Sequence, residues 1–280
     1  MIKPLISIVI PSLNQVDYIE ETIDSIFQQD YRNYELIIMD GGSKDGSQEI
    51  IKKYAHKISY WQSKPDRGQT DAIIEGFRHA KGDLLGWVNS DDILLPGCLS
   101  QIVLAHNRHP DAGLYGGNYL LINAEGIVTR CKKFPRNPGK FARVGLFFIH
   151  QPGSFFKSED YFVCGGLNVE LHYVMDKDLY IRMLLNGTRF EYINEYLAGF
   201  RVHPESKMVS QAGKAAEEWK YARNKYLSKE FNRFYYQKTK IGLLIYYSQQ
   251  MLNGKYLQAY RDYLSINRQH WRSWKGPNLD

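Results

Sequence analysis

The stretch Leu84-Leu-Gly-Trp-Val-Asn-Ser-Asp-Asp92 is an apolar run that ends in two adjacent carboxylates. Read as a buried strand, it brings Asp91 and Asp92 to the carboxyl edge of a sheet, where open α/β folds bind their ligands. Carboxylate oxygens suit Mg²⁺ or Mn²⁺, and such ions usually also hold the phosphates of a substrate. The same two residues also fit an ordinary turn or helix cap, so this stretch alone leaves both interpretations open.

The residues before this stretch alternate between two kinds of apolar spacing. Strands are predicted at 6–10, 36–39, 58–62 and 84–88. Helices are predicted between them at 18–26, 45–54 and 70–80. Because strands that alternate with helices form mostly parallel sheets covered on both faces, the pattern predicts an α/β fold.

After residue 92 the segments become more varied. Helices are predicted at 96–109 and 174–185, a hairpin at 114–123 and 127–133, a basic Pro/Gly loop at 135–143, and strands at 153–157, 190–193 and 198–202. From about Gly213 the apolar spacing is helical to the end of the chain. We therefore predict a domain over 1–210, with halves at about 1–95 and 96–210, and a C-terminal helical extension over 211–280.

Composition points to a globular protein of a reducing compartment. The chain has 280 residues, of which 44% are hydrophobic and 24% charged. Its three cysteines, Cys98, Cys131 and Cys164, are far apart and form neither a zinc spacing nor a disulfide framework. The N-terminus has no signal-peptide pattern, and no apolar run reaches membrane-spanning length. We expect a cytoplasmic protein without a transmembrane helix.

Charge is concentrated in the extension. Residues 211–280 hold 13 Lys and Arg against 5 Asp and Glu, together with 14 aromatic residues. The extension therefore carries +8 of a chain whose net charge is +6, which leaves −2 for the body. Such asymmetry suggests contact with an anionic membrane surface or a phosphorylated acceptor. A packed helical extension with a solvated basic face, or a homo-oligomer interface, fits the same composition.

Four polar loops follow predicted strands and should meet at one edge of the sheet. They are Pro11-Ser-Leu-Asn14, Asp40-Gly-Gly42-Ser-Lys-Asp45, Asp66-Arg67-Gly-Gln-Thr-Asp71 and Asn89-Ser90-Asp91-Asp92. A glycine-rich turn lets the backbone approach a ligand closely. Asp40 offers an acceptor to a base or ribose, and Arg67 offers a cation to a phosphate. Taken singly, each loop also fits turn chemistry or capping.

In order and spacing these loops resemble those of family 2 glycosyltransferases. The resemblance extends to His150-Gln-Pro152, Cys164-Gly-Gly-Leu167, Met175-Asp-Lys-Asp-Leu179 and Arg201-Val-His203, and it fades in the extension. It implies a GT-A fold, in which a Rossmann-like nucleotide-binding half precedes an acceptor half. It also implies a hexosyltransferase that uses a nucleoside diphosphate sugar, UDP-linked in the first instance, and inverts the anomeric carbon.

The resemblance also assigns a donor site and a metal site. The donor-binding positions correspond to Pro11, Asn14, Asp40, Gly42, Arg67, Asp71, Asn89, Ser90 and Asp91. Asp91 matches the last carboxylate of the metal-binding Asp-X-Asp motif, Asp92 follows it, and His203 matches a histidine near the metal or diphosphate. These matches imply Mg²⁺ or Mn²⁺. Asn89 stands at the first position of the motif, where a neutral amide is a poorer ligand than a carboxylate.

The catalytic base implied by the resemblance is Asp176. Met175 stands where the family has a glutamate, so one carboxylate of the pair is missing. A base has only to reach the acceptor hydroxyl in its unprotonated form, which Asp176 can do alone. Asp178 is the second candidate, and capping of the helix to Leu185 is the structural alternative for Asp176.

The acceptor is the least constrained partner. Basic residues at 130–143 and in the extension fit a glycan or lipid-linked glycan acceptor at the inner face of a membrane, in cell-surface polysaccharide assembly. Substitution of carboxylates by Asn89 and Met175 keeps open a catalytically silent nucleotide-sugar-binding or scaffold protein of the same fold. A dinucleotide oxidoreductase is excluded because no Gly-X-Gly-X-X-Gly follows the first strand, and no recognition motif supports nucleic-acid binding.

Overall fold

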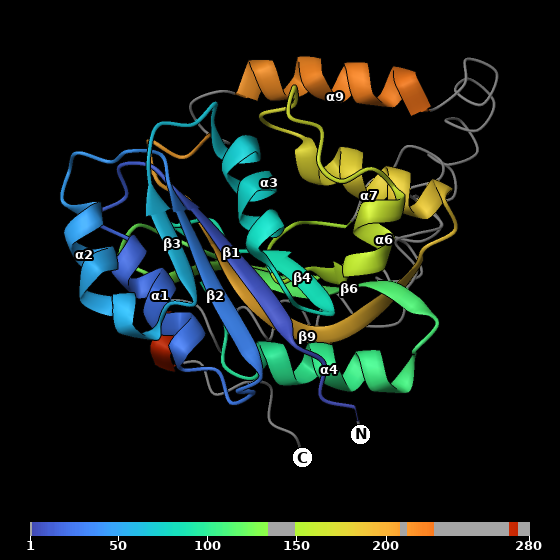
Figure 1. Cartoon of the computed structure of the whole chain (residues 1–280), viewed down its shortest axis with the longest axis horizontal. Helices are drawn as coiled ribbons and strands as arrows, with labels where there is room; N and C mark the ends of the chain where they lie inside the picture. The colour runs from blue at the N-terminus through green and yellow to red at the C-terminus, as the bar shows by residue number, and fades with distance from the viewer. Residues whose placement is uncertain (1, 134–148, 208–211, 227–268, 274–280) are drawn as a thin grey trace.

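The computed structural model describes residues 2–133, 149–207, 212–226 and 269–273. These residues form one curled sheet with helices on both faces (Figure 1). The strand order is β3-β2-β1-β4-β8-β6-β9-β5, with β7 paired to β6. The predicted α/β fold is therefore confirmed.

The first four strands are parallel and follow the predicted alternation. They are β1 (Ile6–Ser12), β2 (Tyr34–Asp40), β3 (Tyr60–Ser63) and β4 (Leu84–Trp87). The helices between them are α1 (Ile19–Phe27), α2 (Ser47–Tyr54) and α3 (Gln69–His79). Side chains of one strand point alternately to the two faces: Ile8 packs with α1 and α2, whereas Val9 packs with α3. Both faces of β1 and β4 are covered, which is why these two strands contain apolar runs, whereas the edge strand β3 is only partly buried.

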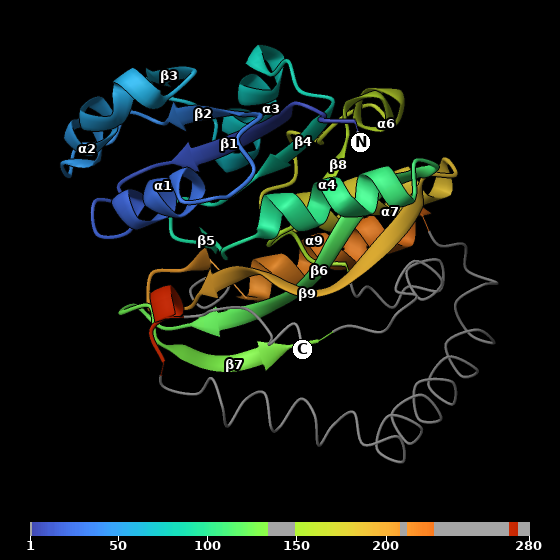
Figure 2. The ribbon, with the colours of Figure 1, turned by 90° about the horizontal axis from the view of Figure 1, so that it is seen from below.

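The second half continues the sheet with mixed pairing. Its strands are β5 (Ile93–Leu94), β6 (Ala112–Ile122), β7 (Val128–Lys132), β8 (Phe155–Lys157) and β9 (Arg189–Arg201). Its helices are α4 (Cys98–Arg108), α6 (Ser158–Val163) and α7 (Met175–Leu185). Helix α4 joins the layer of α1 and α2, and α6 and α7 join that of α3 (Figures 1 and 2). The hairpin is confirmed as β6 and β7.

One prediction for this half was wrong in detail. The two late strands expected at 190–193 and 198–202 are a single strand, β9, which runs parallel to β6. The ladder shifts register at Gly117 and Asn118 of β6, so that Asn118 faces Tyr196 while Gly117 faces Ile193. The extra residues form a bulge rather than a turn, and the bulge interrupts the apolar pattern without ending the strand.

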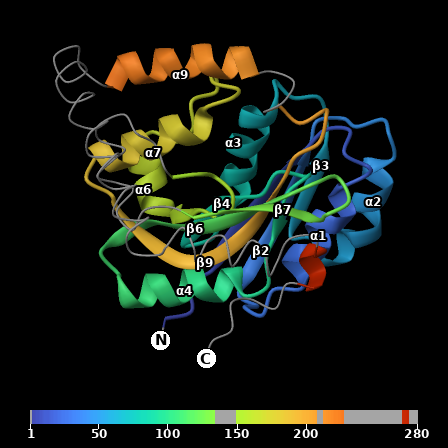
Figure 3. The same ribbon diagram turned by 180° about the vertical axis from the view of Figure 1, so that it is seen from behind.

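Described parts of the extension pack on the body. Helix α9 (Ala212–Tyr226) lies beside α7, and a 3₁₀ turn (Trp271–Ser273) lies beside α1 (Figures 1 and 3). Among the described residues no helix has the length and apolar character that crossing a membrane requires. The basic loop predicted at 135–143 and most of the helical segments predicted after 226 lie outside the described residues.

Candidate active site

The loops that follow β1 and β2 are joined by side-chain hydrogen bonds. The backbone N–H of Asn14 donates to Ser43 Oγ at 2.8 Å, and the Asn14 side chain accepts from the Lys44 N–H at 3.0 Å. The Val16 N–H donates to Asp45 Oδ2 at 2.9 Å. Asn14 takes a left-handed backbone conformation with φ of 51°, which asparagine tolerates better than most residues. These hydrogen bonds hold the two loops together. The first loop follows the end of β1, where Pro11 is buried.

Asp40 fixes the turn of the loop that follows β2. Its buried carboxylate accepts hydrogen bonds from the Gly42 and Ser43 N–H groups at 3.1 and 2.9 Å. It also accepts from the hydroxyls of Ser43 and Ser63, the latter at 2.5 Å. Gly42 has a φ of +88°, so the turn needs a glycine there. Gly42 and Ser43, together with Ser63 of β3, hydrogen-bond the Asp40 carboxylate, so a nucleotide that contacted this carboxylate would share it with these groups.

Arg67 and Asp71 form an ion pair at the start of α3. The Arg67 guanidinium lies 2.8 Å from Asp71 Oδ1, and the Arg67 N–H donates to the other oxygen at 3.1 Å. The hydrogen bond from Arg67 lowers the pKa of Asp71. Arg67 is 73% exposed, so its charge stands at the rim of the site.

The two carboxylates after β4 differ in environment. Asp92 is buried, and its oxygens accept from the Arg201 N–H and from the Asn89 side chain, both at 2.8 Å. Burial, and then the charge of Asp91, raises the pKa of Asp92 well above its ordinary value. Asp91 keeps 21% of its side chain exposed, and its Oδ2 lies 3.1 Å from His203 Nε2. Asp92 therefore fastens the loop to β9, while Asp91 is the carboxylate that reaches solvent.

Asn89 and Ser90 complete this loop. The Asn89 side-chain oxygen accepts from Gln69 at 2.6 Å, and its amide nitrogen bonds Asp92 and, at 3.3 Å, Gln151. Ser90 is buried, and its carbonyl accepts from the Thr22 hydroxyl at 3.0 Å. Both polar ends of Asn89 are thus engaged within the protein, and the residue links the carboxylate loop to α3.

Asp91 and His203 are the donors that fit a divalent cation. Their ligand atoms face each other, and the His203 ring packs against Tyr18 with a centroid separation of 4.7 Å. Within the described ranges no group of three or more His, Cys, Asp and Glu side chains could hold a metal by itself. One or two protein ligands completed by substrate phosphates and water is the usual arrangement for Mg²⁺ at phosphate sites. The residues present therefore fit a cation that binds together with a diphosphate.

Asp176 lies in the first turn of α7. Burial raises the pKa of the Asp176 carboxyl, against the opposing effect of Lys177 and of backbone N–H groups. Burial, and then the charges of Asp92 and Asp176, raise the pKa of Tyr119 to about 12. Both carboxylates thus contribute to the electrostatic environment of Tyr119.

The two neighbours of Asp176 have structural contacts. Met175 is buried against α3, with its sulfur 3.1 Å from the Thr70 hydroxyl. Asp178 is buried, pairs with Arg182 at 2.6 Å and accepts from the Tyr226 hydroxyl at 2.8 Å. Both oxygens of Asp178 are engaged within the fold, which disfavours Asp178 as a candidate base.

Arg201 was not predicted as a site residue, but it bonds the loop that bears Asp91 and Asp92. Arg201 at the end of β9 is fully buried and donates from Nε to the Asp91 carbonyl at 2.7 Å. It also bonds Glu21 of α1 and the Ala124 carbonyl, the latter at 2.8 Å. Its place in the Arg201-Val-His203 motif was visible, but its partners are distant in sequence.

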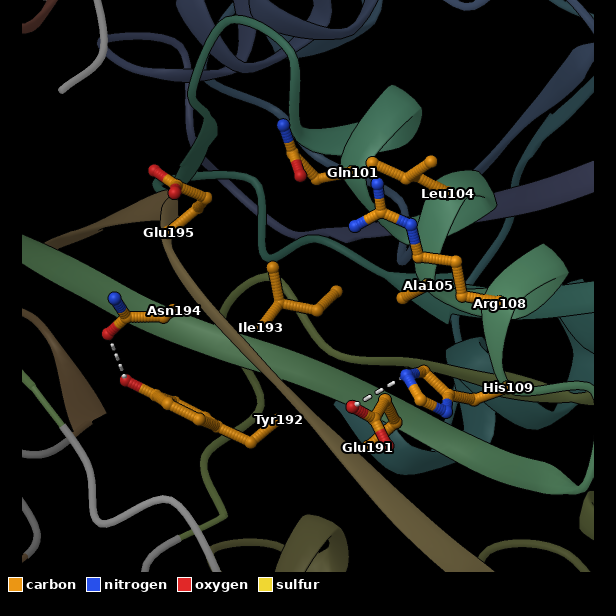
Figure 4. Close-up of a pocket in the computed structure, with 10 residues that line it drawn as sticks. All are labelled: Gln101, Leu104, Ala105, Arg108, His109, Glu191, Tyr192, Ile193, Asn194 and Glu195. Carbon is orange, nitrogen blue, oxygen red and sulfur yellow. Dashed lines mark hydrogen bonds and ion pairs between the residues drawn. The ribbon is translucent and has the colours of Figure 1, made fainter. Parts of the chain in front are cut away.

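A separate pocket lies between α4 and β9 (Figure 4). His109 faces Glu191 there, with His109 Nε2 and a Glu191 oxygen 3.5 Å apart, and Arg108 also lines the pocket. None of the predicted site residues lines this pocket, so it is not the site described above.

Comparison with known proteins identifies the family and the fold. The model of glycosyl transferase family 2 matches residues 7–164. An uncharacterized glycosyltransferase of Rickettsia felis is 31% identical over 219 residues, which are 74% of this chain and 36% of that protein. One of Mycobacterium tuberculosis is 31% identical over 185 residues, which are 65% of this chain and 70% of that protein. The chain thus spans about a third of the first relative's length.

Two groups of solved structures share the fold. Residues 1–349 of S. aureus TarS in complex with UDP-GlcNAc superpose with a TM-score of 0.61 at 16% identity, over 73% of this chain and 60% of that one. The Pyrobaculum calidifontis mannosyltransferase PcManGT, in complex with GDP-Man and Mn²⁺, gives a TM-score of 0.55 at 18% identity over 81% and 62%. These likenesses confirm the expected GT-A fold.

Proposed function

The chain belongs to glycosyl transferase family 2, and we propose that it moves a hexose from a nucleoside diphosphate sugar to an acceptor hydroxyl with inversion. The observation that carries this proposal is the meeting of the Asp91–His203 pair and the two joined loops at one sheet edge. Open α/β folds bind ligands at that edge.

A nucleoside diphosphate is the donor class that the loops favour. The joined loops that contain Asn14 and Gly42 offer a surface for a base and ribose, and the glycine lets the backbone approach them closely. The exposed Arg67 offers a cation to phosphate. Related structures hold UDP-GlcNAc in one case and GDP-Man in the other. A UDP-linked sugar is our first choice of donor, and Asp40 supports the site by fixing the turn.

Asp91 and His203 would hold Mg²⁺ or Mn²⁺ together with the donor's diphosphate, and the ion would neutralise the charge of the leaving group. Asp92 and Asn89 support this site by fixing the backbone of the loop, because their polar atoms are bonded within the protein. The low number of protein ligands makes metal and nucleotide binding mutually dependent.

Asp176 acts as the base in this proposal. It takes the proton of the acceptor hydroxyl, whose oxygen bonds to the anomeric carbon from the face opposite the diphosphate. The bond from that carbon to the diphosphate oxygen breaks, and the nucleoside diphosphate leaves with the electron pair. A pKa raised by burial makes Asp176 a stronger base than an ordinary aspartate. No covalent sugar–enzyme intermediate is needed.

For the acceptor we propose a glycan or lipid-linked glycan of cell-surface polysaccharide assembly, reached at the inner membrane face. The support is the +8 charge of residues 211–280 and the exposed Arg130 and Lys133 near β7. Basic surfaces of this kind attract anionic lipids and diphosphate-bearing acceptors.

Replacement of Asp176 by asparagine tests the assignment of the base. The Asp176→Asn variant should lose about 10²-fold or more of its sugar transfer or donor hydrolysis, with donor affinity nearly unchanged. Asp111→Asn is the matched control, because Asp111 is an exposed surface residue paired with Arg189. Wild-type turnover by Asp176→Asn would show that another group is the base.

A silent nucleotide-sugar-binding protein is the second candidate. It is favoured by Met175, which is packed against Thr70, and by Asn89, whose amide is engaged within the protein. Tight donor binding without turnover of UDP-, GDP- or dTDP-sugars by the wild-type chain would support it.

A further inference from the structure

Residues 269–273 are docked on the hairpin of β6 and β7. The Val128 N–H donates to the Gln269 carbonyl at 3.0 Å, and the Trp271 N–H donates to the Gly126 carbonyl at 3.1 Å. Between these bonds, His270 forms a β-bridge with Ile127. The backbone of this short segment therefore extends the hairpin edge, next to α1 (Figures 2 and 3).

The Trp271 side chain enters the core of the second half. It is 1% exposed and packs in the cluster that contains Leu120, Ile122 and Val128. Its indole N–H donates to Glu21 Oε1 at 2.6 Å. A buried indole normally bonds its single donor, and here the acceptor is a carboxylate of a different layer.

Glu21 links Trp271, through Arg201, to the loop of residues 89–92. Its second oxygen accepts from the guanidinium of Arg201, whose side chain is fully buried. Arg201 in turn donates from Nε to the Asp91 carbonyl, and its backbone N–H bonds Asp92 Oδ1. A continuous chain of four bonded groups thus runs from Trp271 to the loop that bears Asp91.

We propose that Trp271 is a positioning residue of the donor site: it fixes Glu21, and through Arg201 it fixes the backbone of Asp91 and Asp92. The inference rests on the proposed metal and diphosphate site at Asp91. It makes a segment near the end of the chain part of the structural support of that site. Partners that orient a metal ligand in this way usually change metal affinity by about 10–100-fold when they are replaced.

Trp271→Phe is the informative variant, because phenylalanine keeps an aromatic ring in the cluster and removes only the N–H donor. Calorimetric titration of Mn²⁺ in the presence of UDP or GDP should give a Kd about tenfold higher than for the wild-type full chain. Nucleotide affinity in EDTA should change less than twofold. Asp111→Asn is the control, since Asp111 is 61% exposed and pairs with Arg189 rather than with a residue of this hydrogen-bonded chain.

Hydrogen exchange tests the positioning without any ligand. In Trp271→Phe the amides of residues 89–92 should exchange faster, while those of β2 keep their wild-type rates. Unchanged exchange at 89–92, or a Mn²⁺ affinity equal to that of wild type, would overturn the role of Trp271. If the wild-type chain binds no nucleotide at all, the proposed donor site fails, and the exchange result still decides whether Trp271 holds the loop.

Discussion

Replacement of Glu218 by alanine should destabilise the fold, although Glu218 lies in the extension. Its carboxylate accepts from the backbone N–H groups of His172, Tyr173 and Val174 at 2.8–3.2 Å. These donors precede α7, the helix of Asp176, which has no side-chain cap of its own. Glu218 therefore caps α7 from another helix by accepting from the N-cap amide of Val174 and from the two amides before it.

The size of the effect follows from these contacts. Loss of a capping side chain costs about 1 kcal/mol, and loss of a negative charge at a helix N-terminus costs about 0.3–1 kcal/mol. We expect the Glu218→Ala variant to unfold with a free energy about 1–2 kcal/mol lower than wild type. Glu217 is exposed on the same helix, so Glu217→Ala should change the value by less than about 0.5 kcal/mol.

Equilibrium unfolding in urea measures this difference directly. Both variants exchange glutamate for alanine in α9, so the change in helix propensity cancels in the comparison. The capping account requires Glu218→Ala to be the less stable variant by about 1 kcal/mol or more. Equal stabilities of the two variants would refute it and would leave α9 as a helix that rests on the body without supporting α7.

Three further predictions concern the base, its neighbour and the sheet. Because burial raises the pKa of Asp176 above its ordinary 3.8, kcat for donor hydrolysis should fall with decreasing pH at a midpoint above 3.8, as the base becomes protonated; a midpoint at or below 3.8 would count against this. Asp178→Asn should lower the free energy of unfolding by about 3 kcal/mol, because it leaves the guanidinium of Arg182 without its buried partner; thermal or urea unfolding indistinguishable from wild type would argue otherwise. Gly117→Ala should destabilise by about 1–3 kcal/mol in the same assay, since the added Cβ would lie 2.6 Å from the carbonyl oxygen of Ile193, and a more stable variant would contradict the close approach of β6 and β9.

The sequence predicted the first half of the fold well because its signals are local. β1, β2 and β4 contain apolar runs, and the helices between the first four strands repeat apolar residues at helical spacing. The two-residue strand β5 is too short to show any periodicity, and the bulge opposite Gly117 hid the continuity of β9. Both depend on partners distant in the chain, which periodicity does not report.

In the candidate site, too, residues with a local sequence signal were predicted and contacts between distant residues were not. The resemblance pointed to Asp91, His203 and Asp176, and the structure brings Asp91 to His203. The supporting role of Asp92 was not predictable, since it depends on Arg201, more than a hundred residues away.

The charge and aromatic content of the extension predicted either contact with an anionic surface or partner, or a helical extension packed on the body with a solvated basic face. Charge alone did not reveal that Glu218 caps α7 or that Trp271 enters the core.

The most direct test of the proposed donor site is calorimetric titration of the wild-type chain and Asp91→Ala with UDP, GDP and dTDP, with and without Mn²⁺. We expect one nucleotide to bind the wild-type chain, with an affinity that Mn²⁺ raises about tenfold or more. Asp91→Ala should keep the metal-free affinity and lose the effect of Mn²⁺. Absence of binding to the folded wild-type chain, or an undiminished Mn²⁺ effect in Asp91→Ala, would contradict the assignment of the donor and metal site to Asp91.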